Sequence, residues 1–314
     1  MKLCFIFNPC SGRHRRNARL LPLLRDFIAA RSLDATLVAT DGPGHATELA
    51  REAVAAGCLR IVAVGGDGTM NEVAQALLRT PSELAMVPCG SGNGLALHLC
   101  LARTPLGALE LAAGADGRTA EVDTGVVNGH PFFNAMGLGF DAEVAQSFNR
   151  LTRRGLPAYT ATALRAFNRR KTERCVISTG NRREEFDSLL IAVANSDQYG
   201  NRAMIAPGAR VDDGVLDLVA VGPVGLFSAL DLGARLFLGS IDRSRHVRRL
   251  RGSRFVIQRP AAGVVHTDGE VHQTGGTLEI SILPRSLRVL VPSESPVTRP
   301  AEDRLTASFA LQLP

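Results

Sequence analysis

Apolar strand patterns and amphipathic helix patterns alternate over the first part of this sequence, and no other feature restricts its fold as strongly. Strands are predicted at 3–7, 34–40, 60–66 and 84–90, and helices at 18–32, 45–57, 70–79 and 95–101. The helix patterns repeat apolar residues at a spacing of about 3.6. This alternation predicts an α/β domain in which a parallel sheet is covered by helices on both faces, with three-layer packing.

The second half of the sequence has a different texture, because strand patterns crowd together after Asp123. They lie at 130–140, 174–179, 188–195, 215–221, 254–258, 263–272, 277–283 and 287–291, with helix patterns at 142–170 and 226–239. Closely spaced strands predict a β-rich, sandwich-like domain. We therefore predict a first domain over 1–125, a second over 126–292 and a polar, Pro-rich flexible tail over 293–314. The active site is expected in the cleft between the domains.

Composition argues against several classes of protein. The six cysteines form no CxxC pair, which disfavours a zinc site or a disulfide framework and favours a reducing cytosol. The apolar run at the N-terminus is too short for a signal peptide. No apolar stretch reaches the roughly 18 residues of a membrane span. The sequence therefore predicts a cytoplasmic protein whose membrane contact is peripheral.

The basic residues gather in clusters within a chain of net charge +6. The clusters lie at 13–16, 150–154, 169–171 and 243–259. Arginine pairs with phosphate through forked hydrogen bonds, so the predicted partners are a phosphorylated substrate or an anionic membrane surface. Each cluster is also compatible with an ordinary solvated face. Nucleic acid is not expected, because no recognition motif accompanies the charge.

The stretch IVAVGGDGTMNEVAQALL, residues 61–78, places a glycine loop between a buried strand and a helix. Glycines let backbone N–H groups approach phosphate oxygens, and the positive end of the next helix points to the same place. Asp67 in such a loop would repel phosphate unless a cation intervened, which predicts binding of a Mg²⁺–nucleotide. The alternatives are a tight turn for the glycines and a capping box for Thr69 and Glu72.

Two further loops follow the same plan. MVPCGSGNGLALHL runs from a strand through Gly90, Gly92 and Gly94 into a helix, and NPCSG at 8–12 follows the first strand. Loops that follow neighbouring parallel strands lie at one edge of the sheet, where they could surround a nucleotide. Three such loops in one domain favour phosphate binding over three unrelated turns.

The ordered set of motifs resembles the diacylglycerol kinase catalytic-domain family, which includes soluble bacterial lipid kinases and, more distantly, sphingosine and ceramide kinases. The motifs are NPCSG, Thr40 with Gly44-His45-Ala46, GGDGTMNEV, PCGSGNGLA, EVDTG, FFNAMGLGFDAEV, APGARVDDGVLDL and HTDGE. The resemblance covers roughly residues 2–292. It implies an ATP-dependent lipid kinase that uses Mg²⁺ and acts on a membrane lipid, and a homodimer is compatible with it.

The resemblance also implies a role for individual residues. Glu270 matches the proposed general base, and Asp67 and Asp123 match further active-site carboxylates. Asp213, with the carbonyls of Arg210 and Val215, matches a structural Mg²⁺ site, and Asp141 and Glu143 lie where a headgroup contact is expected. For His45 and His266 we favour structural roles. The positions that match the ATP site are Asn8, Pro9, Cys10, Ser11, Gly12, Thr40, Gly65, Gly66, Asp67, Gly68, Thr69, Met70, Asn71 and Ser91.

One departure from the family pattern concerns the acceptor. Diacylglycerol-type members carry Asp after the Asn of the second glycine loop, whereas this chain has Gly94, as in a sphingosine-kinase context. The acceptor is therefore left open between a diacylglycerol-like lipid, a sphingoid base and ceramide. Two other interpretations stay open, namely a kinase of soluble substrates such as an NAD kinase and a non-catalytic nucleotide- or lipid-binding regulator.

Overall fold

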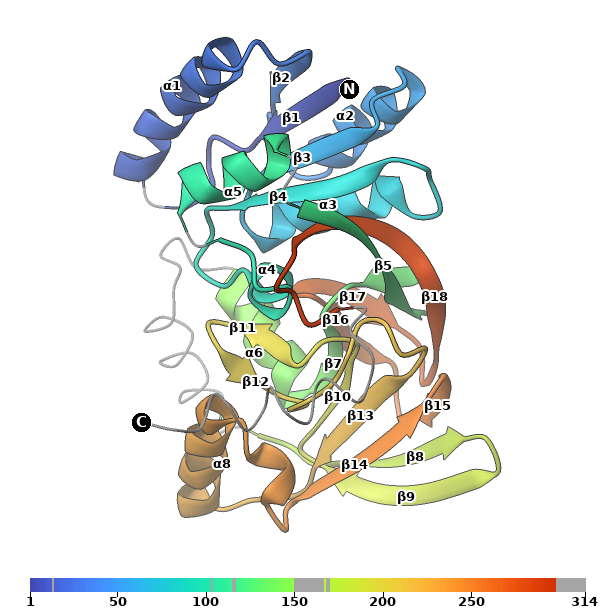
Figure 1. The fold of residues 1–314 in the computed structure, drawn as a ribbon. Coiled ribbons are helices and arrows are strands. Elements are labelled where there is room, and N and C mark those ends of the chain that lie inside the picture. Colours follow the sequence, from blue (N-terminus) through green and yellow to red (C-terminus); the bar gives the residue numbers. More distant parts are fainter. Residues whose placement is uncertain (13, 103, 115–116, 150–166, 168–169, 298–314) are drawn as a thin grey trace.

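The structure is a computed structural model that describes residues 1–314 except 13, 103, 115–116, 150–166, 168–169 and 298–314 (Figure 1). Several sequence predictions fall outside the described residues. These are the basic cluster at 150–154, parts of the clusters at 13–16 and 169–171, most of the helical stretch after residue 149, and the tail beyond residue 297.

The first domain is an α/β unit, as the sequence predicts. Its elements are β1 (Leu3–Phe7), α1 (His14–Ala30), β2 (Ala35–Ala39), α2 (His45–Ala55), β3 (Arg60–Gly65), α3 (Asp67–Leu77), β4 (Glu83–Pro88), α4 (Gly94–His98), α5 (Pro105–Ala113) and β5 (Gly117–Val127). The four parallel strands lie in the order β2-β1-β3-β4. One core cluster packs α1 and α5 on one face of the sheet, and another packs α2, α3 and α4 on the other. The predicted three-layer packing is confirmed.

The second domain is β-rich. Its elements are β6 (His130–Phe132), β7 (Ala135–Gly139), α6 (Phe140–Asn149), β8 (Glu173–Thr179), β9 (Arg182–Ser188), β10 (Leu190–Ala194), β11 (Gln198–Gly200), β12 (Ala203–Met204), β13 (Leu216–Val221), α8 (Leu226–Leu238), the 3₁₀ helix η1 (Ile241–Arg243), β14 (Val247–Gly252), β15 (Arg254–Gln258), β16 (Gly263–Thr267), β17 (Glu270–Thr274) and β18 (Thr277–Pro292).

Two sheets form the predicted sandwich. One has the strand order β14-β13-β10-β7-β16-β17, and the other is made by the first half of β18 with β15, β8 and β9, together with β5 and β6. Their inner faces enclose an apolar cluster that includes Phe132, Leu218 and Phe255. The outer face of the first sheet carries a further apolar cluster, to which α6 and α8 contribute.

The last long strand joins the two domains, which the sequence pattern does not predict. The first half of β18 pairs with β15, and its second half reaches the parallel sheet, where Val289 pairs with β4 (Figure 1). β5 pairs with both halves of β18. Leu287, Val289 and Val291 enter the core of the first domain, and so does Val297 from the predicted tail. The chain therefore returns to its first domain at the end, which fixes the domains to each other.

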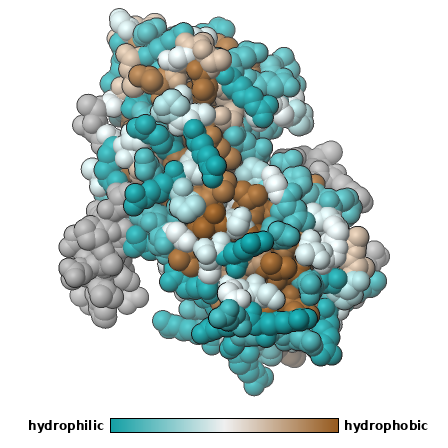
Figure 2. Space-filling view, turned by 90° about the vertical axis from the view of Figure 1, so that its right-hand side faces the viewer, coloured by the Kyte–Doolittle hydropathy of each residue, from teal (hydrophilic) through white to brown (hydrophobic). Residues whose placement is uncertain are grey.

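Hydrophilic residues cover most of the face on the right of Figure 1, while apolar residues gather near its centre (Figure 2). Among the described helices, none is long and apolar enough to cross a membrane.

Candidate active site

The predicted nucleotide positions lie together at one edge of the parallel sheet. Asn8 follows β1, Thr40 follows β2, Asp67 follows β3 by one residue, and the loop from Cys89 to Gly94 follows β4. The strands are parallel and adjacent, so their carboxyl ends open into loops on the same side. The sheet therefore collects four loops that are far apart in the sequence.

A side-chain hydrogen bond joins the loop after β1 to the first turn of α3, which follows β3. The Asn8 amide donates to Thr69 Oγ1 at 2.9 Å, and Asn8 Oδ1 accepts from the Cys10 N–H at 2.8 Å. Thr40 is buried, and its N–H donates to the Phe7 carbonyl. Gly68 and Ser91 are exposed, whereas the Met70 side chain lies in the core. Any contact of Met70 with a nucleotide would therefore come from its backbone.

The two glycine loops pack backbone against backbone. A Cβ on Gly90 would lie 2.7 Å from the Gly66 Cα, and a Cβ on Gly65 would lie 2.5 Å from Thr69 Oγ1. The first distance is too short for any side chain against a backbone, so the contact between the loops requires glycine at position 90. The second leaves no room for a side chain at position 65 beside Thr69. A tight turn alone therefore does not explain Gly66 and Gly90, because these two residues form the contact between the loops.

Asp67 ties these loops together. Its Oδ2 accepts the Asn93 N–H at 2.7 Å, and its Oδ1 accepts the Gly94 N–H at 2.8 Å. Burial raises the pKa of Asp67, and the two N–H groups oppose that rise. A half-buried carboxylate with two backbone donors stabilises the arrangement of the second loop. Asp67 thus has a structural role in addition to the metal role that the sequence predicts.

The capping box predicted for Thr69 and Glu72 does not form. Helix α3 begins at Asp67 with Gly66 as its N-cap, so Thr69 lies inside the first turn. Glu72 Oε2 instead accepts the N–H of Ala46, in the first turn of α2. The Thr69 hydroxyl instead accepts a hydrogen bond from the Asn8 amide.

The second glycine loop also contacts the second domain. The Asn201 N–H donates to the Gly92 carbonyl at 3.2 Å, and His98 Nδ1 lies 2.7 Å from Asp197 Oδ1. A Cβ on Gly94 would lie 3.2 Å from Asn134 Oδ1. An aspartate at position 94, as in diacylglycerol-type members, would therefore have to displace Asn134. The glycine at position 94, where the family pattern has Asp, thus allows the close contact with Asn134.

Glu270 follows a hairpin turn that is fixed to the same region. Asp268 and Gly269 have φ of 50° and 90°, and Thr267 pairs with Glu270 across the turn. The Asp268 carboxylate accepts the N–H groups of Phe133, Asn134 and Ala135 at 2.7–2.9 Å. Burial raises the pKa of Asp268 to about 6, against the effect of these donors. The Glu270 side chain is exposed.

Contacts through Asn134 connect the hairpin to the glycine loops. Asp67 accepts from Gly94, Gly94 packs on Asn134, and the Asn134 N–H donates to Asp268. Only Gly269 separates Asp268 from Glu270. A base at Glu270 therefore follows a turn held beside the loops that are predicted to bind the nucleotide. Asn93 and Asn134 lie within two of the motifs quoted from the sequence, but neither was predicted as a site residue.

Backbone groups from two other segments hold the Asp123 carboxylate in place. Its Oδ2 accepts the Gly214 N–H at 2.7 Å, its Oδ1 accepts the Arg285 N–H at 2.8 Å, and its own N–H donates to Val211. The residue is buried, and this burial raises the pKa of Asp123. The arrangement joins β5 to two distant loops, which is a structural role. Direct contact of Asp123 with a substrate stays a prediction.

Asp141 and Glu143, the predicted headgroup contacts, differ in access to solvent. Asp141 is buried, and its Oδ2 lies 2.7 Å from His266 Nε2 and accepts the Tyr199 hydroxyl at 2.8 Å. The ion pair raises the pKa of His266 and lowers the pKa of Asp141, against the effect of burial on each. Glu143 is exposed on α6. Contact of either residue with a headgroup stays a prediction, and of the two only Glu143 is open to solvent.

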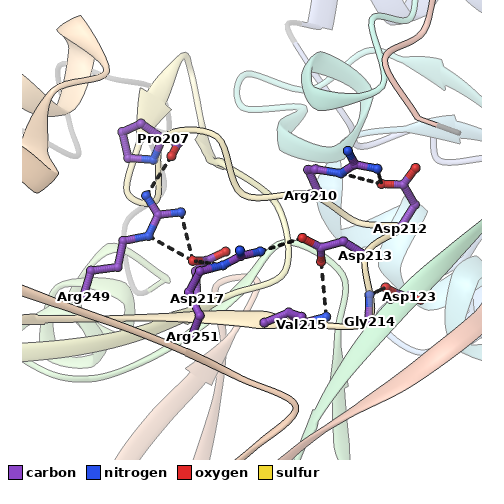
Figure 3. Close-up of polar contacts among 10 residues, drawn as sticks. All are labelled: Asp123, Pro207, Arg210, Asp212, Asp213, Gly214, Val215, Asp217, Arg249 and Arg251. Carbon is purple, nitrogen blue, oxygen red and sulfur yellow. Dashed lines mark hydrogen bonds and ion pairs between the residues drawn. The ribbon is translucent and has the colours of Figure 1, made fainter. Parts of the chain in front are cut away.

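Asp213, the carboxylate among the predicted Mg²⁺ ligands, already pairs with an arginine of β14. Arg251 Nη2 lies 2.6 Å from Asp213 Oδ2, and Asp213 Oδ1 accepts the Val215 N–H at 3.2 Å (Figure 3). The Arg210 side chain pairs with Asp212. Among the described residues, no group of three or more His, Cys, Asp or Glu side chains could hold a metal ion. Asp213 is thus paired with a guanidinium in this structure, and a Mg²⁺ site made of Asp213 and the carbonyls of Arg210 and Val215 stays a prediction.

The same guanidinium supports a buried carboxylate on the neighbouring strand. Arg251 faces Asp217 across β14 and β13, and its Nε lies 3.1 Å from Asp217 Oδ1. Arg249 donates to the same oxygen at 2.9 Å and to the Pro207 carbonyl at 2.8 Å (Figure 3). Burial raises the pKa of Asp217, and both arginines oppose this rise. Removing one arginine would leave the other paired with Asp217, whereas removing both would leave its buried carboxylate without a cation.

We expect Arg251→Gln to lower the free energy of unfolding by about 1–3 kcal/mol, because Asp213 loses its cation while Arg249 still pairs with Asp217. We expect Mg²⁺ to raise the melting temperature of this variant and to leave that of the native protein nearly unchanged. Thermal unfolding with Mg²⁺ and with EDTA measures both effects.

Arg254→Gln is the matched control, since it removes the same charge from an exposed pair with Glu279 and should change stability by less than about 1 kcal/mol. A native protein that melts much lower in EDTA would instead support the predicted metal site.

Comparisons with known proteins agree with this geometry. Residues 2–127 match the family model of the diacylglycerol kinase catalytic domain, and residues 134–291 match that of the YegS C-terminal NAD kinase beta sandwich-like domain. A Pseudomonas aeruginosa (strain UCBPP-PA14) protein named "Probable lipid kinase YegS-like" is 34% identical over 83% of this chain and 86% of its own length. A protein of that name from Klebsiella pneumoniae (strain 342) is 29% identical over 88% and 91%.

Solved structures show the same fold. The crystal structure of a diacylglycerol kinase from Bacillus anthracis strain Sterne matches with a TM-score of 0.71 at 22% identity, over 94% of this chain and 98% of that one. The chain belongs to the diacylglycerol kinase catalytic-domain family, among the lipid kinases that carry the YegS C-terminal domain. It is therefore a kinase, a transferase of phosphoryl groups.

Proposed function

We propose that this protein transfers the γ-phosphoryl group of ATP to a hydroxyl group of a membrane lipid. The observation that carries the proposal is the link from Asp67 through Gly94 and Asn134 to Asp268. It connects glycine loops suited to phosphate with a turn that presents a free carboxylate. Phosphoryl transfer requires little more of a protein than positioning and charge stabilisation.

Each part of the site has a task in this reaction. The backbone N–H groups of the loops and the start of α3 would bind the phosphates, and Asn8 would hold the loops together. Glu270 would accept the proton of the lipid hydroxyl as it attacks phosphorus. Mg²⁺, when bound with the nucleotide, would neutralise phosphate charge. Glu143 would contact the headgroup.

The acceptor is a diacylglycerol-like lipid, a sphingoid base or ceramide, with Gly94 as the feature that favours the latter two. Transfer of label from γ-labelled ATP to each of these lipids in mixed micelles tests the proposal. We expect one lipid class to be labelled well above the others. Labelling of NAD and of no lipid would support a soluble-substrate kinase, and nucleotide binding without any transfer would support a regulator.

A further inference from the structure

Helix α8 has a second apolar face that packs on nothing in the described structure. Its inner face places Leu232, Ala229 and Leu236 against the outer apolar cluster of the sandwich. Its outer face carries Leu226 (54% exposed), Phe227 (87%), Leu230 (56%), Phe237 (43%) and Leu238 (76%). A surface helix of a water-soluble domain normally shows polar residues on its outer side.

This concentration is specific to α8. Eight large hydrophobic side chains are exposed among the described residues, and five of them belong to this one helix. The others are Met1, Leu59 and Leu106, all in the first domain. Single exposed apolar residues are ordinary, whereas a contiguous patch marks an interaction surface.

The spacing of these residues makes one continuous stripe. At about 100° per residue, positions 226, 227, 230, 237 and 238 fall within roughly 120° of the helix circumference. Asp231 and Arg235, which pair at 2.7 Å, lie along one edge of the stripe. The apolar stripe thus has a polar border, the arrangement of helices that lie in a membrane interface.

Basic residues follow the helix at its C-terminal end. Arg243 and Arg245 are exposed just beyond α8, with one exposed carboxylate, Asp242, between α8 and Arg243. The charges of Arg248, Arg249, Arg251 and Arg254, from the same predicted cluster, are already paired with carboxylates of the chain. Arg243 and Arg245 are therefore the cluster members that remain to meet anionic headgroups.

We propose that α8 docks this kinase on the membrane by inserting its outer stripe at the level of the lipid headgroups. The proposal rests on a lipid as the acceptor, because such an acceptor requires contact with a bilayer. Thirteen helical residues extend about 20 Å, which is too short to span the hydrocarbon core and suits a helix lying along the surface. α8 and α6, which carries Glu143, cover the same face of one sheet (Figure 1).

The absence of tryptophan from this chain gives a direct test. Phe227→Trp places a single tryptophan on the stripe, and Leu59→Trp places one at another exposed site, in the first domain. We expect vesicles of phosphatidylcholine and phosphatidylglycerol to shift the emission of the first variant to shorter wavelength, and brominated acyl chains to quench it. The emission of the Leu59→Trp control should not change.

A loss-of-binding pair completes the test. Phe227→Ser with Leu238→Ser should weaken vesicle co-sedimentation about 10-fold or more, because the stripe loses two of its apolar side chains. Leu59→Ser with Leu106→Ser, the matched control, should bind as the native protein does. Since apolar insertion is little screened by salt, native binding should decrease but persist at high salt.

The outcomes separate the docking helix from the proposed reaction. If the emission of the Phe227→Trp variant does not change on addition of vesicles, the docking role is overturned. It is also overturned if the emission shifts to shorter wavelength with rising protein concentration in the absence of vesicles, because a second copy of the chain then covers the stripe. Activity on a short-chain lipid below its micelle concentration should be equal in the native and serine variants. Vesicle insertion without any lipid phosphorylation would contradict the proposed reaction and leave α8 as a docking helix.

Discussion

Glu270→Gln is expected to lower kcat by about 10²- to 10⁴-fold and to leave nucleotide binding nearly unchanged. The amide keeps the shape of the side chain but cannot accept the proton of the attacking hydroxyl. The fold should persist, because Glu270 is exposed and the turn before it is held by Asp268. Turnover on the best lipid and titration of the nucleotide are the two measurements required.

The control for this substitution is Glu48→Gln, which makes the same chemical change at an exposed position on α2. It should leave both measurements unaltered. If Glu270→Gln retains its turnover, the proton leaves by another route. If nucleotide binding collapses together with turnover, the residue supports the loops and is not the base.

Asp67→Asn should lower kcat/KM for the nucleotide by about 10²-fold or more and should also loosen the second glycine loop. An asparagine side chain has one acceptor oxygen, whereas Asp67 accepts from both Asn93 and Gly94. In either orientation an amide NH₂ would face a backbone N–H, and an unsatisfied buried donor costs about 1–3 kcal/mol. The negative charge beside the phosphates is lost as well.

Asp41→Asn provides the comparison, because Asp41 is exposed near the end of β2 and close to the same sheet edge. It should retain turnover and melting temperature. Steady-state kinetics and thermal unfolding of both variants decide the matter. Turnover of Asp67→Asn within a few-fold of the native rate would contradict both roles given to this carboxylate.

The glycine loops were predictable because their geometry follows from local rules. A buried parallel strand that ends in glycines and continues into a helix must open at the carboxyl edge of the sheet. That rule places Asn8, Gly66 and Gly90 beside one another before any contact is known. The alternation of strands and helices likewise predicts the three-layer first domain.

The parts that escaped prediction depend on contacts between distant segments. Asp268 acts on backbone N–H groups about 135 positions earlier, and no local pattern marks such a partner. Strand β9, RREEFDS, is polar because it is a charged edge strand, so it lacks the apolar alternation that identifies strands. The arginines at 248–254 resemble a solvated basic face until Glu184, Asp217 and Glu279 are seen opposite them.

If this chain moves the γ-phosphoryl group of ATP to a lipid hydroxyl, as we propose, the γ phosphate must be recovered in the lipid. The most direct test incubates the native protein with lipid vesicles and ATP labelled either at the γ or at the α phosphate, and then measures label in the extracted lipid. We predict label from γ-labelled ATP alone, and almost none with Asp67→Asn or Glu270→Gln. Lipid that stays unlabelled with every acceptor class, or equal labelling by the native protein and both variants, would contradict the claim.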